Sequence, residues 1–272
     1  MDISFIVKKL SLSLPFPRIL SLLVCAGFVA ACHPGPAKTN SDNVQKLMDN
    51  GYSPAPVVNE VTQSGPGMLT VKGQALPDGR VRFILGPQRA IGVTADSKGR
   101  FSADLPADPK GSVFDLLMED RGRLMHAEGR LFVPPGQPAK AIIMRPGAAS
   151  LPVARQPEGI AVLDYDAAGA LAVSGRVAPK TAVDVIVNGQ LRGAQPISAG
   201  DGAYTAMTQM LPAPGDSPTT LNIVIEAGGA TWKRDVMVSR PADDGDHVTL
   251  IPEGWRVDWK VPGGGVQTTL VF

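Results

Sequence analysis

Cysteine is scarce in this sequence, which has two cysteines in 272 residues. Cys25 lies inside an uncharged N-terminal stretch, and Cys32 stands at the end of that stretch. If the chain is exported and cut before Cys32, the mature protein keeps one cysteine, and this excludes an internal disulfide. A lone thiol in an oxidising compartment is reactive unless it is chemically occupied, so we expect Cys32 to be modified.

Histidine and catalytic motifs are also scarce. The three histidines, His33, His126 and His247, are too scattered to suggest a metal centre. The patterns HExxH, CxxC, GxSxG, SxxK and GxxxxGKS/T do not occur in the chain. The sequence therefore predicts no cofactor, no metal site and no enzymatic activity. Catalytic groups are sometimes assembled from distant positions, so an enzyme with an unrecognised site stays open as an alternative.

The densest cluster of potential metal ligands lies near the C-terminus. Asp243, Asp244, Asp246 and His247 are crowded around Gly245. Such carboxylates bind Ca²⁺ through hard oxygen atoms, but the spacing of an EF-hand loop is missing. We therefore predict a solvated turn at this position.

Net charge and aromatic content are both low. Without residues 1–31 the chain has 23 basic and 24 acidic residues, which offers no electrostatic footprint for nucleic acid. Aromatic residues make up 5% of the sequence, whereas 30 glycines and 25 prolines are present. Frequent turn residues favour many short strands over long helices, so the predicted fold class is all-β.

The N-terminal segment has the features of an export signal. Lys8, Lys9 and Arg18 precede residues 19–31, which carry no charge. A basic region followed by a short apolar region is typical of a signal peptide. The uncharged stretch is shorter than the about 20 residues that span a bilayer, so a permanent transmembrane helix is the weaker interpretation.

The end of this segment, Val29-Ala30-Ala31-Cys32, resembles the lipobox of bacterial lipoproteins. The resemblance implies that the signal peptidase recognises Val29, Ala30 and Ala31, and that residues 1–31 are removed. It also implies that Cys32 receives a diacylglycerol thioether and an N-acyl chain such as palmitate. Several acyl chains hold a protein firmly at a membrane surface. His33 stands where inner-membrane lipoproteins of enteric bacteria carry Asp, which favours the outer membrane; a secreted protein cut nearby is the alternative.

The mature chain is predicted to begin with a tether and to continue as an internal repeat. Residues 32–55 are rich in Pro, Gly, Ser and Asn, which is typical of a flexible tether. The matches that define the repeat have a constant shift of 102 residues, with Leu69, Val71 and Gly73 recurring as Leu171, Val173 and Gly175. The similarity covers residues 56–146 and 158–252, with a linker at 147–157, and pairs Ala141 to Pro146 with Val248 to Pro252.

Each repeat has the length and turn pattern of a small β-sandwich. A turn signal recurs in both repeats before a Leu-Pro pair, as Asp96, Gly99 and Phe101 and as Asp201, Gly202 and Tyr204. Glycine supplies the positive φ of such a turn, Asp caps it, and the aromatic residue re-enters the core. The pattern resembles bacterial Ig-like and carboxypeptidase-regulatory-like modules, which implies two tandem Ig-like β-sandwiches. The Cys, Trp, Cys framework of antibody domains is missing.

A separate β-hairpin is predicted for residues 253–272. Trp255, Val257, Trp259 and Val261 alternate with polar residues, a glycine-rich turn follows, and residues 266–272 form the returning strand. A lone hairpin is unstable in water, so it must join a sheet or pair with a partner. Trp255 and Trp259 should project from one face. That face is predicted to pack in a core; if it is exposed, the two residues are candidate contacts for a protein partner or a glycan.

These patterns predict a lipid-anchored protein of the bacterial cell envelope that acts as a non-catalytic binding, scaffolding or assembly module. Its expected partners are a membrane, through the N-terminal lipid, and another envelope protein. The alternatives are a module that binds peptidoglycan or capsule and, further off, an enzyme.

Overall fold

The computed structural model describes residues 53–86, 88–120, 122–191 and 195–272. The predicted signal peptide, the lipobox with Cys32 and most of the predicted tether lie outside the described residues. Within those ranges the regular structure is β-strand apart from one 3-10 turn, η1 (Pro138–Lys140), which confirms the all-β fold class. In the same ranges, no helix has the length and apolar character that a membrane span requires.

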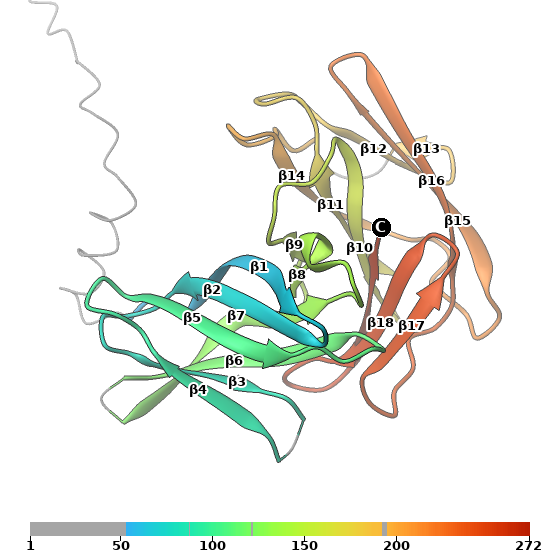
Figure 1. Ribbon diagram of the computed structural model, residues 1–272. Helices are drawn as coiled ribbons and strands as arrows, with labels where there is room; N and C mark the ends of the chain where they lie inside the picture. Colours follow the sequence, from blue (N-terminus) through green and yellow to red (C-terminus); the bar gives the residue numbers. More distant parts are fainter. Residues whose placement is uncertain (1–52, 87, 121, 192–194) are drawn as a thin grey trace, which may run out of the picture.

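The first module is a β-sandwich (Figure 1). Its smaller sheet has the order β1-β2-β5, and its larger sheet has the order β4-β3-β6-β7-β8-β9. Side chains alternate between core and solvent along most strands, as in β5, where Phe101, Ala103 and Leu105 are buried. The strands are β1 (Val57–Gly65), β2 (Met68–Gln74), β3 (Arg80–Ile84), β4 (Ala90–Thr94), β5 (Arg100–Pro106), β6 (Ser112–Asp120), β7 (Arg123–Val133), β8 (Ile142–Met144) and β9 (Leu151–Pro152).

The second module repeats this arrangement and adds strands at one edge. Its sheets have the orders β14-β11-β10-β19-β18-β17 and β13-β12-β15-β16. The strands are β10 (Gly159–Asp166), β11 (Ala170–Arg176), β12 (Asp184–Val187), β13 (Gln190–Leu191), β14 (Ala203–Gln209), β15 (Thr219–Ala227), β16 (Ala230–Val238), β17 (His247–Ile251), β18 (Gly254–Lys260) and β19 (Val266–Val271).

The internal repeat of the sequence is a repeat of the fold. The pairings β1-β2-β5 and β4-β3-β6-β7 recur as β10-β11-β14 and β13-β12-β15-β16, so both modules have seven equivalent strands, three facing four. Even an irregularity is shared, because the bulge that follows Val58 in β1 recurs after Ile160 in β10. The shift between these two residues is the 102 residues of the sequence repeat.

The turn signal of each repeat is formed as predicted. The Oδ1 of Asp96 accepts the backbone N–H groups of Lys98 and Arg100 at 2.8 and 2.9 Å, and Asp201 accepts that of Ala203 at 3.0 Å. The pKa values of both aspartates are lowered, chiefly by these backbone hydrogen bonds. Gly99 and Gly202 have φ of 78° and 90°, and both aromatic residues, Phe101 and Tyr204, are buried.

Two details of the strand arrangement differ from the sequence-based expectation. Strand β8 continues the sheet of β7, whereas β17 pairs with β18 in the sheet of β10, so Ala141 to Pro146 and Val248 to Pro252 are not structural equivalents. Similar alternating residues fit any strand, and pattern alone does not distinguish sheets. The predicted linker contains a strand, β9, which pairs with β8. The C-terminal hairpin β18–β19 is not a separate unit but joins a sheet of the second module, because β19 pairs with β10.

Candidate functional site

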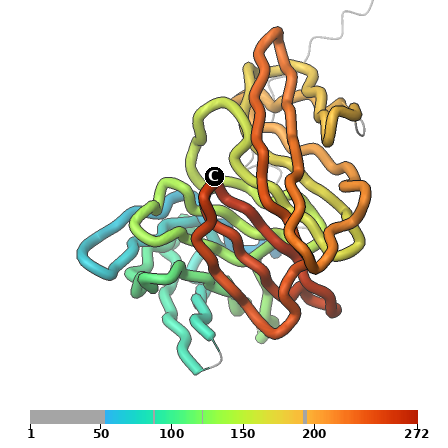
Figure 2. Tube along the Cα trace, turned by 90° about the vertical axis from the view of Figure 1, so that its right-hand side faces the viewer, coloured from blue at the N-terminus to red at the C-terminus, as the bar shows by residue number. Residues whose placement is uncertain are grey.

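The two modules are joined face to face by an apolar contact. Phe132, Ile142 and Met144 of β7 and β8 pack on residues of β10, β18 and β19, which are Ala161, Val162, Val257, Trp259 and Val271. In both views the red C-terminal strands lie between the green first module and the yellow and orange strands of the second (Figures 1 and 2). Strands β10 and β19 are consequently buried on both faces along almost their whole length. We call this contact the module junction.

The tryptophans of the C-terminal hairpin belong to the module junction. Trp259 is 0% exposed, and its Nε1–H donates to the Oγ1 of Thr269 at 3.1 Å. Trp255 packs against the same apolar cluster from its edge and is half-buried. The two tryptophans therefore lie on the same face of the hairpin, and this face is part of the buried core at the position of Trp259. The indole of Trp259 has no surface for a protein partner or a sugar ring while the modules stay packed.

A buried carboxylate lies beside Trp259. Asp164 of β10 is 3% exposed. It accepts hydrogen bonds from the backbone N–H and the hydroxyl of Ser150, both at 2.6 Å, from the hydroxyl of Thr269 at 2.7 Å and from the Nε2 of Gln267 at 3.2 Å. Burial raises the pKa of Asp164, and the hydrogen bonds from Ser150, Thr269 and Gln267 act against that rise. Because the hydrogen-bond donors to Asp164 lie in the linker and in β19, this carboxylate holds the linker and β19 against β10.

The linker is fixed to the second module by further hydrogen bonds. The hydroxyl of Ser174 donates to the carbonyl of Ser150 at 2.6 Å, so all three polar groups of Ser150 have partners. The side-chain amide of Gln267 accepts the backbone N–H of Gly147 at 3.0 Å and donates to the carbonyl of Arg145 at 3.2 Å. A buried polar network in which every member is satisfied holds its segments in one arrangement.

An ion pair crosses between the modules outside the apolar contact. Arg130 of β7 lies 2.7 Å from a carboxylate oxygen of Asp115 and 2.8 Å from one of Asp246, which precedes β17. The Arg130 side chain is 20% exposed, so its charge is less screened than that of a surface pair. Apolar packing, the polar network and this ion pair together fix the two modules as one body.

The predicted turn at residues 243–247 has hydrogen-bonding partners of its own. The Nε2 of His247 lies 2.6 Å from Asp244, and this contact lowers the pKa of the Asp244 carboxyl. Asp246 pairs with Arg130. Across the part of the chain that the structure describes, no three His, Cys, Asp or Glu side chains gather closely enough to hold a metal ion.

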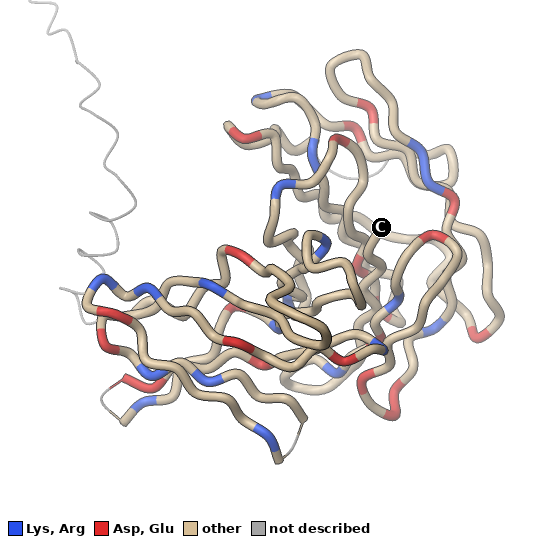
Figure 3. The backbone as a smooth tube through the Cα atoms, viewed as in Figure 1, with Lys and Arg blue, Asp and Glu red and all other residues tan. Residues whose placement is uncertain are grey.

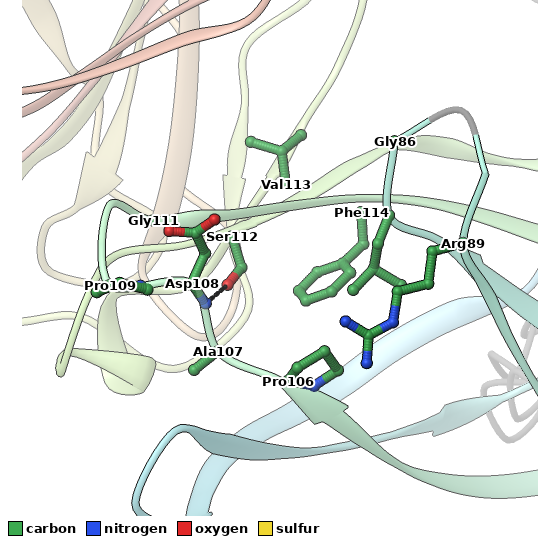
Figure 4. Close-up of a pocket in the computed structure, with 11 residues that line it drawn as sticks. Gly86, Arg89, Pro106, Ala107, Asp108, Pro109, Gly111, Ser112, Val113 and Phe114 are labelled. Atoms are coloured by element: carbon green, nitrogen blue, oxygen red, sulfur yellow. Dashed lines mark hydrogen bonds between the residues drawn. The ribbon is translucent and has the colours of Figure 1, made fainter.

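Acidic and basic residues are interspersed along the backbone of both modules rather than gathered by sign (Figure 3). The surface has several hollows. One of about 460 Å³ lies between the β3–β4 turn and the β5–β6 loop, where the backbone N–H of Asp108 donates to the hydroxyl of Ser112 (Figure 4). A second, of about 550 Å³, is lined by η1, the end of the linker and β16. We call it the Trp232 cleft, after the side chain on its wall.

Sequence reasoning missed both the Trp232 cleft and the buried network around Asp164. A signal for the junction exists in the repeat itself. Thr70 and Lys72 of β2 are replaced, 102 residues later, by Ala172 and Ser174 of β11, and these smaller residues are buried. The change from Thr and a charged Lys to the smaller, uncharged Ala and Ser on the outer face of one repeat indicates that something covers that face. For the cleft, the signal is the spacing of Trp232 and Arg234, which are two residues apart in a strand and therefore lie on the same face.

No family model matches the sequence, and no curated protein matches it. A solved structure described as "Biofilm associated protein - BSP domain" is similar over 68% of this chain, at 14% sequence identity and a TM-score of 0.24. The similar region makes up 29% of that protein, so this chain spans less than a third of it. The strand pairings define a protein of two tandem Ig-like β-sandwiches, which pack against each other at the module junction.

Proposed function

We propose that this chain is a lipid-anchored, non-catalytic protein of the bacterial cell envelope that binds or scaffolds another envelope component. The observation that carries the proposal is the packed module junction, in which Trp259 is 0% exposed and Asp164 is 3% exposed. A scaffold must hold its binding surfaces at a fixed distance and angle. Two modules that share a packed apolar contact, a satisfied polar network and an ion pair meet this requirement.

The polar groups at the junction support a structural rather than a catalytic role. Ser150 with Asp164 is the arrangement most similar to a nucleophile with an acid, and Ser150 is 0% exposed. All polar groups of Ser150 are engaged by Asp164 and Ser174. A substrate has no path to such a hydroxyl, so we assign the network to holding the linker.

The anchor is tested through Cys32, with Cys25 as the matched control. We expect Cys32→Ser to prevent lipidation and to leave the leader uncut, so that the protein has the mass of the full precursor without diacylglycerol or acyl groups. Cys25→Ser should mature as the unaltered protein does, because Cys25 lies in the segment that is removed. Intact mass reports cleavage and lipidation of each variant, and detergent phase partitioning reports whether each variant is lipid-anchored. A mature Cys32→Ser protein that partitions like the unaltered one would refute the anchor.

Binding is tested by photo-crosslinking in intact cells from exposed apolar positions. Met207, Met237 and Leu250 are 53%, 45% and 68% exposed and lie on β14, β16 and β17. A photoreactive amino acid at each position samples a different edge of the fused body. The proposal expects a discrete, light-dependent adduct from at least one position. Absence of any adduct from all three positions would contradict a scaffolding role for these edges.

A further inference from the structure

The Trp232 cleft has walls from both modules. Its lining includes Lys140 of η1, Gln156 of the linker, Glu158 just before β10, and Trp232 and Arg234 of β16. The Nε2 of Gln156 donates to the carbonyls of Ala139 and Ala154 at 2.8 and 3.1 Å, which fixes the linker against η1. Its volume of about 550 Å³ lies in the range of small-molecule sites, about 300–1,000 Å³.

Trp232 presents an aromatic ring at this cleft. The ring lies against the backbone of Gly159, where an added Cβ would come within 2.9 Å of its Cδ1. Its inner part packs on the core of the second module, and the residue remains half-exposed. Among the described residues, its Nε1–H makes no hydrogen bond. The side chain therefore offers an apolar ring surface and one unused donor on a rigid support.

Arg234 lies one alternation further along the same strand. Its guanidinium stacks on the ring of Phe272 at 4.2 Å, and its Nε donates to the carbonyl of Ile160 at 3.4 Å. Burial lowers the pKa of Arg234, whereas the charge of Glu253 acts against that shift. No carboxylate of the described chain lies within ion-pair distance of this guanidinium.

Three other partly buried arginines have the ion pair that Arg234 lacks, whereas Arg176, which is 6% exposed, has no carboxylate within ion-pair distance among the described residues. The side chains of Arg130, Arg145 and Arg256 are 20%, 20% and 14% exposed, and each has a carboxylate within 3.0 Å. A partly desolvated cation usually has such a partner, because desolvation without compensation is unfavourable.

A second unpaired cation faces the cleft from the first module. Lys140 is half-buried, and no described carboxylate lies within ion-pair distance of it. Glu158 is the one acidic residue among the lining residues and is exposed. The cleft lining therefore combines an aromatic surface with three cations, Lys140 on one wall and Lys233 and Arg234 on the other, which suits a ligand with a ring and a negative charge.

We propose that the Trp232 cleft binds an acidic saccharide, with a sugar ring packed on the indole of Trp232 and its carboxylate held by Arg234 and Lys140. A pyranose ring has an apolar face of C–H groups that packs on aromatic rings, and a guanidinium matches the planar geometry of a carboxylate. This inference goes beyond the proposed function, because the cleft requires neither the lipid nor a protein partner. Its failure would leave the anchor and the scaffold role intact.

The experiment titrates the mature full-length protein, in detergent, with trigalacturonate while calorimetry and tryptophan fluorescence are recorded. Maltotriose serves as the neutral control, and ATP as a ligand with a ring and phosphates. We expect trigalacturonate to bind and maltotriose to bind at least about 10-fold more weakly, because the charge-assisted hydrogen bonds are lost. Arg234→Gln should weaken trigalacturonate binding about 10-fold or more, and Lys140→Gln about 2- to 5-fold.

Two further variants keep the test decisive if Arg234→Gln does not fold. Trp232→Ala should abolish the fluorescence response and weaken binding about 10-fold, because the stacking surface is removed. Lys110→Gln removes a positive charge from the β5–β6 loop, outside the cleft, and should leave binding unchanged. Equal affinity for maltotriose, tighter binding of ATP, indifference to Lys140→Gln, or no binding of trigalacturonate up to about 10 mM would each overturn the proposal.

Discussion

Truncating Trp259 tests the module junction directly. Aromatic side chains bury about 150–250 Å² on folding, which at about 25 cal/mol per Å² corresponds to about 4–6 kcal/mol. Trp259 is 0% exposed, so it should realise most of that value. Truncation of buried aromatic residues to Ala costs about 3–5 kcal/mol, and we expect Trp259→Ala to lower the free energy of unfolding by this amount.

The form of the unfolding transition should change as well as its midpoint. Because Trp259 lies between the modules, its loss weakens the contact that couples them while each sandwich keeps its own core. We expect the unaltered protein to unfold in one transition and Trp259→Ala to unfold in two. Urea unfolding monitored by circular dichroism and thermal unfolding monitored by calorimetry would both show the difference. Limited proteolysis should then cut the linker, residues 147–157, which is protected in the intact junction.

Two further variants show which part of the effect comes from the buried ring of Trp259, which from its hydrogen bond, and which from position in the cluster. Trp259→Phe keeps a ring and loses the bond to Thr269, so it should cost about 1–2 kcal/mol and retain a single transition. Trp255→Ala removes a half-buried ring from the edge of the same cluster and should cost less than Trp259→Ala. If Trp259→Ala unfolds at the same urea concentration as the unaltered protein, or no less stably than Trp255→Ala, the assignment of the junction is refuted.

Two other perturbations follow from the same geometry. Burial raises the native pKa of Asp164 above 3.8, so the folded state binds the proton of this carboxyl group more tightly than the unfolded state does. As pH rises from about 4 through the native pKa, the unaltered protein should therefore lose stability relative to Asp164→Asn, as measured by urea titrations at several pH values. A stability difference between the two proteins that does not change with pH would contradict this expectation. Gly175→Ala should lower the urea midpoint by an amount equivalent to about 2 kcal/mol or more, because its Cβ would lie 2.0 Å from the carbonyl oxygen of Gly159. Gly200→Ala, with no atom within 4 Å of its Cβ, is the matched control and should change stability little.

The repeat and its turns were predictable because their signals are local. A period of two residues places Leu69 and Val71 on one face, and both are buried. The glycine that follows them is required by sterics: a Cβ at Gly73 would lie 2.1 Å from the carbonyl of Val57 and 2.3 Å from the ring of Phe101. The same requirement holds at Gly175. Residues fixed by their neighbours along a strand leave a pattern that a single sequence reveals.

The contact between the modules was not predictable in the same way. Asp164 alternates with apolar residues, as a solvent-facing position in a strand does, yet it is 3% exposed. Its burial depends on Ser150, Gln267 and Thr269, which approach it from segments up to 105 residues away. A hydrogen-bonded carboxylate and an exposed one look alike in a sequence. The same ambiguity made Trp259 a candidate surface contact, although its surroundings are core.

The C-terminal strands explain why two similar modules make different contacts. Within the described residues, β1 pairs with β2 alone, whereas the equivalent β10 pairs with both β11 and β19. Strand β19 supplies Gln267 and Thr269 to the polar network, and β18 supplies Trp259 to the apolar contact. The segment that follows the repeat therefore completes the edge of the second sandwich and widens the face on which the first one packs. Since a lone hairpin is unstable in water, the two requirements satisfy each other: the hairpin is stabilised by joining the sheet, and the sheet gains the surface that fuses the modules.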